Sequence, residues 1–69
     1  MQGNKISNRR KELGLTQTDL ANAARVPMRA IQKYENGETK VKNMTLEYAI
    51  RLADALGVEP RELLDDNII

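Results

Sequence analysis

The stretch of residues 16–37 constrains the fold of this 69-residue chain most, because its residues mark the ends of two short helices. Thr16 has the chemistry of a helix N-cap, and Asp19, three residues later, suits the positive end of a helix. Pro27 suits the first turn of a second helix, where its fixed φ and missing N–H are tolerated. Gly37 suits the left-handed position that ends a helix. The stretch therefore predicts two helices joined by a tight turn.

Each of these two helices has one apolar face. The residues predicted to face inward are Leu20, Ala21, Ala24, Ile31 and Tyr34. The outward residues of the second helix are Met28, Arg29, Gln32 and Lys33. The turn between the helices falls near Arg25 and Val26. A polar outer face on a helix seated against a partner helix is typical of a recognition helix.

The arrangement resembles the helix-turn-helix of the phage-repressor and Cro-like family of DNA-binding regulators. The residues that carry the resemblance are Leu15-Thr16-Gln17, Leu20-Ala21, Ile31, Glu35-Asn36-Gly37 and Ala55-Leu56-Gly57-Val58. The similarity covers about residues 5–64. It implies an all-α fold, a compact five-helix domain like the lambda repressor DNA-binding domain, with the helix-turn-helix at about residues 17–36.

The remaining helices follow from apolar spacing and from the residues that end helices. We predict helices at 5–13, 45–56 and 59–65, within one domain that spans residues 1–69, and find no strand-like alternation. In the first helix, Ile6, Arg10 and Leu13 share a face. The predicted buried stripe of the fourth helix is Leu46, Ala49, Ile50, Ala53 and Leu56. We expect residues 1–4 and 66–69 to be flexible or ordered only by a dimer.

Two positions depart from the family pattern. Arg25 stands where the family usually has Gly, at a position with φ > 0, which costs a non-Gly residue about 1–2 kcal/mol. Pro27 stands where the family prefers Ser or Thr, so a side-chain cap worth about 1 kcal/mol is lost. Both departures concern the turn between the two helices.

The composition excludes several classes of function. The chain has no Cys and no His, so disulfides, Cys/His metal sites and the usual nucleophile–base pairs are absent from it. We therefore expect neither an enzyme nor a cofactor. No apolar run approaches the length of a membrane span, and the first five residues have no signal-peptide character. These features predict a cytoplasmic protein without a membrane partner.

The charges are unevenly distributed, although the net charge is only +1. Residues 1–42 contain nine Lys or Arg and four acidic residues, whereas residues 43–69 contain two Arg and six acidic residues. This asymmetry favours a polyanion such as DNA as the partner of the N-terminal part. Chance clustering on a solvated surface is the alternative.

The outward face of the second helix carries the candidates for reading bases. Arg29 and Lys33 can donate to guanine O6 and N7, and Gln32 can bond to adenine N6 and N7. Met28 offers an apolar contact, for instance to a thymine methyl group. The alternative for all four residues is an ordinary solvated helix face.

Other polar residues are candidates for binding the phosphate backbone: Thr16, Gln17, Asn36, Lys40, Lys42 and Asn43. The amide of Gln17 lies at a helix N-terminus, where free N–H groups also bind anions. For Asn36 the phosphate role is implied by the resemblance, and a locally satisfied side chain is the alternative. Lys42 could instead approach the minor groove, and Tyr48 could bond a phosphate or lie at the edge of its helix.

The resemblance also implies an ion pair between Arg10 and Glu35, because the family places Arg and Glu at these positions. A planar guanidinium suits a bidentate pair with a carboxylate. The alternative is that the Arg10 stem lies on the core while its charged head reaches water.

The function expected from these features is sequence-specific binding of double-stranded DNA by a small bacterial or phage repressor that occupies its operator. An antitoxin-like or other protein-interaction module with a protein partner is the alternative. We expect a homodimer on a near-palindromic operator. Its interface would use apolar residues of the C-terminal half: Val58, Pro60, Leu64, Ile68 and Ile69.

Overall fold

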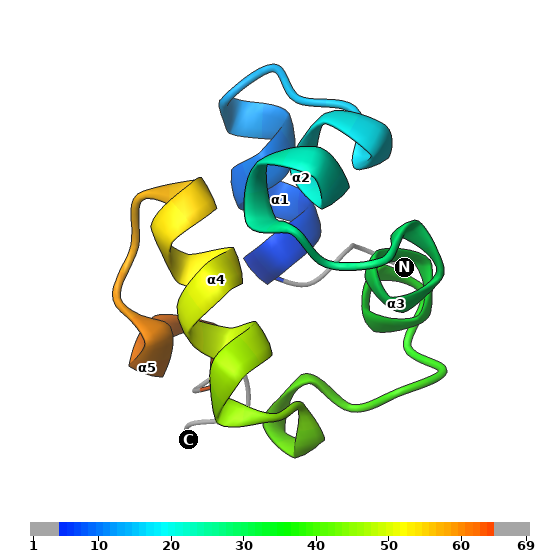
Figure 1. Ribbon diagram of the computed structural model, residues 1–69, viewed down its shortest axis with the longest axis vertical. Coiled ribbons are helices and arrows are strands. Elements are labelled where there is room, and N and C mark those ends of the chain that lie inside the picture. The colour runs from blue at the N-terminus through cyan, green and yellow to red at the C-terminus, as the bar shows by residue number, and fades with distance from the viewer. Residues whose placement is uncertain (1–4, 65–69) are drawn as a thin grey trace.

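The computed structural model describes residues 5–64, except for the side chains of residues 42 and 64, and within this part it contains only helices (Figure 1). The elements are α1 (Lys5–Glu12), α2 (Gln17–Ala24), α3 (Met28–Glu35), the 3-10 turn η1 (Val41–Asn43), α4 (Leu46–Leu56) and α5 (Pro60–Leu64). The predicted all-α class with five α-helices is confirmed.

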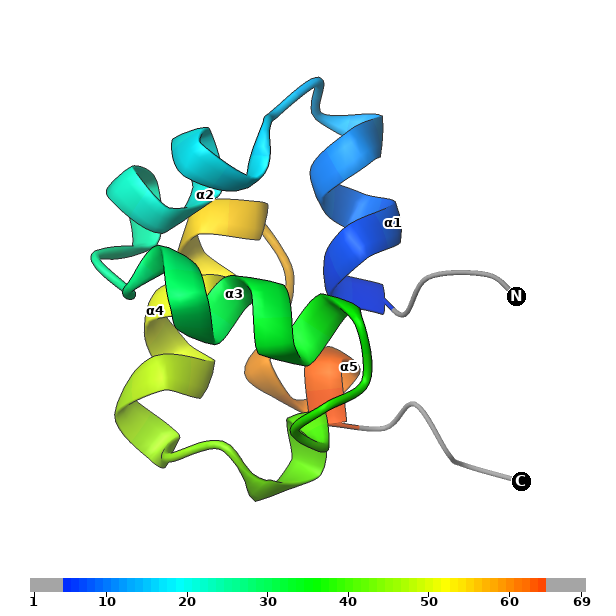
Figure 2. The same ribbon diagram turned by 90° about the vertical axis from the view of Figure 1, so that its right-hand side faces the viewer.

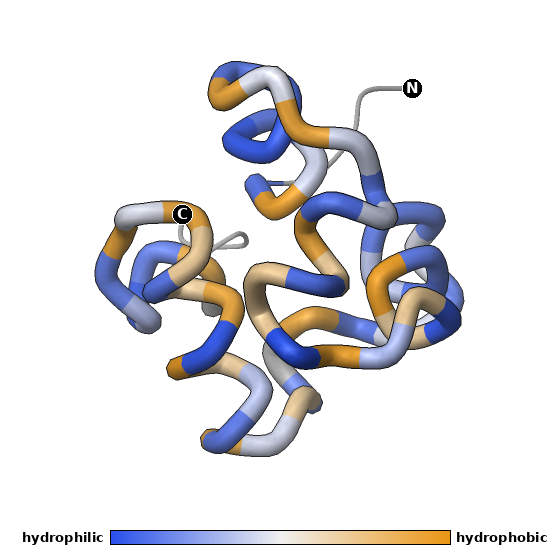
Figure 3. The backbone as a smooth tube through the Cα atoms, turned by 45° about the horizontal axis from the view of Figure 1, so that its top comes forward, coloured by the Kyte–Doolittle hydropathy of each residue, from blue (hydrophilic) through white to orange (hydrophobic). Residues whose placement is uncertain are grey.

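The helices surround one apolar core. α2 packs against α3 and α4, α5 packs against α4 and η1, and α1 contacts α3, α4 and α5. The largest fully buried side chains come from five helices: Ile6, Leu20, Ile31, Leu52, Leu56 and Leu63. Polar and apolar residues alternate along the helices (Figure 3), so each helix can bury one face and leave another in water. This packing leaves α3 at the surface, where it crosses the front of the molecule in Figure 2.

The start of α3 differs from the prediction by one position. Pro27 is the N-cap, with φ −56° and ψ 139°, and does not lie in the first turn. Its carbonyl accepts hydrogen bonds from Ala30 and Ile31 at 2.9 and 3.2 Å. A proline has no side-chain acceptor, so α3 begins without a side-chain cap. The sequence analysis predicts this loss of a side-chain cap, because Pro27 stands where the family prefers Ser or Thr.

The predicted buried stripe of α4 is partly wrong. Leu46 and Ile50 are 72% and 44% exposed, and Leu52, which the prediction left out, is fully buried. The buried stripe is Ala49, Leu52, Ala53 and Leu56. Apolar residues occupy most positions of this helix, so helical spacing alone allows two overlapping stripes. The packing of α2 and α5 on α4 selects one of them and leaves the other in water.

The expectation for Leu13 is also wrong. α1 ends at Glu12, so Leu13 lies in the following turn and is exposed instead of sharing the face of Ile6. Val41, which lies between the predicted helices, begins η1 and is buried. The burial of Val41 fastens the segment between α3 and α4 to the core.

Arg25 has the left-handed backbone that the resemblance implies, with φ 57° and ψ 44°. It is the one non-glycine residue with positive φ among the described residues. Its N–H donates to the carbonyl of Ala21, and its own carbonyl accepts from Nη1 of Arg51 at 3.1 Å. Arg51 also pairs with Glu47 one turn earlier on α4. The strained residue is thus held by α2 on one side and by α4 on the other.

Replacing Arg25 with Gly should raise the melting temperature, because glycine adopts positive φ without steric cost. We expect a gain of about 1 kcal/mol in the free energy of unfolding, or roughly 4–8 °C for a domain of this size. Arg25→Ala is the matched control, since it removes the same side chain and keeps the strain. A melting temperature of Arg25→Gly at or below that of Arg25→Ala would contradict this prediction.

Candidate nucleic-acid interface

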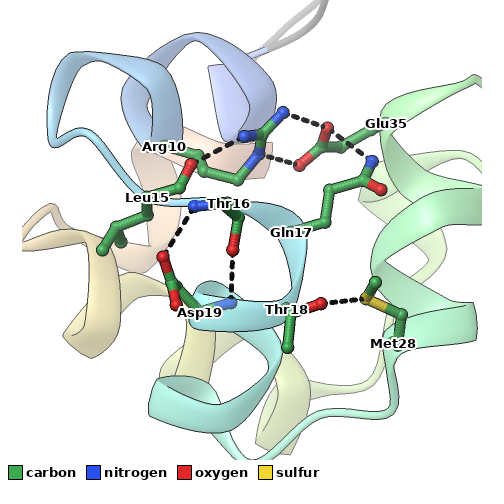
Figure 4. A network of polar contacts seen from close by, with 8 residues as sticks. All are labelled: Arg10, Leu15, Thr16, Gln17, Thr18, Asp19, Met28 and Glu35. Atoms are coloured by element: carbon green, nitrogen blue, oxygen red, sulfur yellow. Dashed lines mark hydrogen bonds and ion pairs between the residues drawn. The ribbon is translucent and has the colours of Figure 1, made fainter.

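A reciprocal pair of hydrogen bonds fixes the start of α2 (Figure 4). The Thr16 hydroxyl accepts from the N–H of Asp19 at 3.0 Å, and the Asp19 carboxylate accepts from the N–H of Thr16 at 3.0 Å. This capping box satisfies two backbone donors of the helix start. The hydrogen bonds from the backbone and side chain of Thr16 lower the pKa of Asp19.

The lowered pKa of Asp19 makes this contribution to stability pH-dependent. A group whose folded pKa is lowered stabilises the fold above its unfolded pKa, and the stabilisation is lost as pH falls through the folded value. In thermal melts between about pH 6 and about pH 2, the wild type should therefore lose more stability on acidification than Asp19→Asn. If the wild type and Asp19→Asn lose equal stability on acidification, the Asp19 carboxylate does not contribute to stability and the prediction is wrong.

The outer face of α3 carries four exposed side chains: Met28, Arg29, Gln32 and Lys33. They are the four residues predicted to point away from the core, whereas Ile31 and Tyr34 are buried. Burial raises the pKa of Tyr34. Arg29 and Lys33, one turn apart, both line a hollow of about 280 Å³ beside α3. Within residues 5–64, neither cation is neutralised by an ion pair.

Arg10 and Glu35 form the ion pair that the resemblance implies (Figure 4). Nε and Nη2 of Arg10 donate to the two carboxylate oxygens of Glu35 at 2.7 and 3.0 Å. The side chains are only 12% and 7% exposed. Nη1 of Arg10 donates to the carbonyl of Leu15 at 2.7 Å, and the hydrogen bond to Glu35 raises the pKa of Arg10. The guanidinium therefore ties α1 to α3 and to the turn before α2.

Gln17 joins this network. Its amide nitrogen donates to Oε1 of Glu35 at 3.0 Å, so the carboxylate holds α1, α2 and α3 together. The sequence predicted a phosphate contact for this amide and did not predict the bond to Glu35. A DNA phosphate would compete with Glu35 for the amide nitrogen of Gln17. The amide oxygen of Gln17 and the N-terminus of α2 are not used in the bond to Glu35.

The other phosphate candidates differ in their local bonding. The hydroxyl of Thr16 caps α2. Asn36 makes a local turn, in which its side-chain oxygen accepts from the N–H of Glu38 at 3.0 Å and its nitrogen donates to the Glu38 carboxylate at 3.3 Å. Lys40 and Asn43 are exposed at the two ends of η1. The side chain of Lys42 lies outside the described part of the chain.

Two further polar contacts between helices were not predicted. The hydroxyl of Thr18 donates to the sulfur of Met28 at 3.7 Å, which joins the first turns of α2 and α3. Nε of Arg9 donates to the carbonyl of Leu56 at 2.9 Å and satisfies the end of α4. Spacing along the chain cannot reveal such pairs, because they depend on how the helices cross.

The remaining candidates come after η1 in the chain. Tyr48 packs against the core, which favours its placement at the edge of α4 over a phosphate contact. Val58 and Pro60, expected at a dimer interface, are half-buried. The side chain of Leu64, together with Ile68 and Ile69, lies outside the described residues. Among residues 5–64, no helix has the length and apolar character needed to cross a membrane, and no acidic residues cluster as metal ligands.

Comparisons with known proteins agree with this geometry. SinR, described as a master regulator for biofilm formation, has a crystal structure in complex with DNA that matches with a TM-score of 0.82 and 26% identity, covering 88% of this chain and 94% of that chain. The N-terminal DNA-binding domain of SinR from Bacillus subtilis matches with a TM-score of 0.83 and 25% identity, covering 94% of this chain and 91% of that chain.

A further structure has higher sequence identity. The restriction-modification controller protein C.AhdI from Aeromonas hydrophila is 33% identical, with a TM-score of 0.73 and coverage of 84% of this chain and 83% of that chain. These neighbours are regulators and not enzymes. No curated protein sequence matches the chain. The helix-turn-helix family model matches residues 6–63. The chain therefore belongs to the helix-turn-helix family and has the fold of its Cro-like and phage-repressor-like DNA-binding regulators.

Proposed function

We propose that this protein binds double-stranded DNA sequence-specifically, as a small transcriptional repressor that reads the major groove with α3. The observation that carries the proposal is the outer face of α3, where Arg29 and Lys33 are exposed one turn apart. The α-helix is the element that the major groove admits, and its Arg and Lys side chains can donate to guanine O6 and N7. Gln32 adds a group suited to adenine.

The proposed backbone contacts flank this helix. Gln17 begins α2, Asn36 ends α3, and Lys40 and Asn43 border η1, so polar groups lie before and after the reading face in the chain. Thr16 and Lys42 complete the proposed set. Phosphate contacts fix the register of the protein on DNA and supply affinity, whereas base contacts supply sequence choice. The excess of basic residues in 1–42, which include α3 and most of these phosphate candidates, favours contact of this part of the chain with DNA.

Binding at two salt concentrations tests the proposal. A duplex enriched from a random library by the protein should bind more tightly than a random duplex of the same length. Affinity for both should fall at least about tenfold between about 50 and about 200 mM salt, since neutralising two phosphates already gives this loss. Failure to enrich any sequence would contradict a sequence-specific function.

We also propose that the protein binds as a two-fold homodimer through its C-terminal half, on a near-palindromic operator. The proposed interface contains Val58, Pro60, Leu64, Ile68 and Ile69, to which α4 adds the exposed Leu46 and Ile50. A small domain has a limited core, so association stabilises it. The symmetry repeats one patch on both subunits and sets the two α3 helices roughly 34–36 Å apart. The same apolar residues also favour the alternative function, in which the domain binds a different protein, as an antitoxin binds its toxin.

Sedimentation at micromolar concentration tests the dimer. The wild type should sediment as a dimer, and Ile50→Glu or removal of residues 65–69 should weaken association at least about tenfold, because each change removes apolar surface from the interface. Lys11→Glu, an exposed charge change on α1, is the control. A wild-type monomer that occupies a single half-site would contradict the dimer.

A further inference from the structure

The contact between Thr18 and Met28 lies at the exposed edge where α2 and α3 meet. In Figure 4 the two side chains point toward each other, and the Thr18 hydroxyl donates to the Met28 sulfur at 3.7 Å. Both residues are exposed, so the contact is not a product of core packing. It joins the second residue of α2 to the first residue of α3.

Met28 needs such a contact to hold one position. A methionine side chain has three rotatable bonds and adapts to many shapes, which makes it a poorly defined reading group when it is free. The hydroxyl of Thr18 donates to the Met28 sulfur and restrains this side chain.

The chemistry of Met28 indicates what it can recognise. The other exposed side chains of the α3 outer face are polar: Arg29, Gln32 and Lys33. Met28 is the one apolar side chain among them, and its thioether can make dispersion contacts. The apolar group that bases present in the major groove is the 5-methyl group of thymine.

We infer that Thr18 is a positioning residue that holds Met28 against the 5-methyl group of one thymine in the DNA site. This inference rests on the proposed function, because it concerns the same reading face. Thr18 acts from α2 through Met28, so its hydroxyl contributes to discrimination between bases and not to general DNA affinity. A restrained methionine loses less rotamer freedom on binding than a free one.

Replacing single thymines by deoxyuridine in the enriched duplex tests the inference, since uracil lacks only the 5-methyl group. At one thymine in each half-site, the wild type should prefer thymine by about three- to fivefold, the value expected for burial of one methyl group. Met28→Ala should reduce this ratio to about one. Thr18→Val, which keeps the shape and removes the hydroxyl, should at least halve the ratio, and Thr18→Ser should retain it.

The outcomes separate this inference from the proposed function. If no duplex is enriched, the proposed function fails. If a duplex is enriched but no deoxyuridine substitution weakens binding, or if Thr18→Val keeps the full ratio, the inference is wrong and the proposed function stands. Thermal melts of the variants without DNA show whether a change in ratio comes from loss of fold, and binding of the deoxyuridine duplex should be unchanged in Thr18→Val.

Discussion

Replacing Arg10 with Ala should lower the free energy of unfolding by about 3 kcal/mol, the low end of the cost of breaking a buried ion pair. The guanidinium and the Glu35 carboxylate are 12% and 7% exposed, so the remaining carboxylate would be left largely buried without its cation. The carbonyl of Leu15 would also lose its donor. For a domain of this size the melting temperature should fall by roughly 12–24 °C.

Two sets of controls show whether burial causes this loss. Glu47→Ala breaks an exposed ion pair with Arg51 on α4 and should cost less than about 1 kcal/mol. The double variant Arg10→Met with Glu35→Leu removes both charges and should recover much of the stability lost by either single change. Chemical denaturation of these variants measures each value. Equal small losses for Glu35→Ala and Glu47→Ala would contradict a structural role of the buried pair.

Replacing Arg29 with Ala should weaken binding to the enriched duplex by about 1–3 kcal/mol and relax the preference at one base position. Its guanidinium is exposed on α3 and is engaged by no ion pair within residues 5–64, so it is available for a two-point contact with guanine. Binding of Arg29→Ala to random DNA should change much less, because only the specific complex contains the base contact.

Lys40→Ala is the matched variant for a backbone contact. It also removes one exposed cation, but from the segment after α3. It should weaken binding to all sequences alike and reduce the slope of log affinity against log salt by about one. Fluorescence anisotropy with the enriched and random duplexes measures both effects. An equal loss on both duplexes for Arg29→Ala would contradict its role as a base-reading residue.

The local features of the helix-turn-helix could be predicted from the sequence because they depend on neighbouring residues. The N-cap role of Thr16 follows from short-range backbone chemistry, and the structure confirms it and adds the reciprocal bond to Asp19. The left-handed Arg25 was expected from the resemblance, because the family usually has Gly at this position, and the structure confirms this conformation. The ion pair between Arg10 and Glu35 joins residues far apart in the chain. It was expected only from the resemblance to a family, since spacing cannot bring two such residues together.

The features that sequence could not predict depend on how helices pack. Leu46 and Ile50 satisfy the same helical spacing as the true stripe of α4, and only the placement of α2 and α5 separates the two stripes. Likewise, the bond from Gln17 to Glu35 and the contact from Thr18 to Met28 require the crossing of α2 and α3. These contacts determine which side chains are free to meet DNA.

Titration of the ¹⁵N-labelled protein with its enriched duplex tests most directly whether α3 is the surface that reads DNA. We predict that the largest amide and side-chain shifts fall on Arg29, Gln32 and Lys33, with smaller shifts at Gln17 and Lys40. A random duplex at the same salt should shift the backbone-binding residues and leave α3 nearly unchanged. Shifts confined to α4 and α5, with those of α3 unaffected by the enriched duplex, would contradict recognition through this helix.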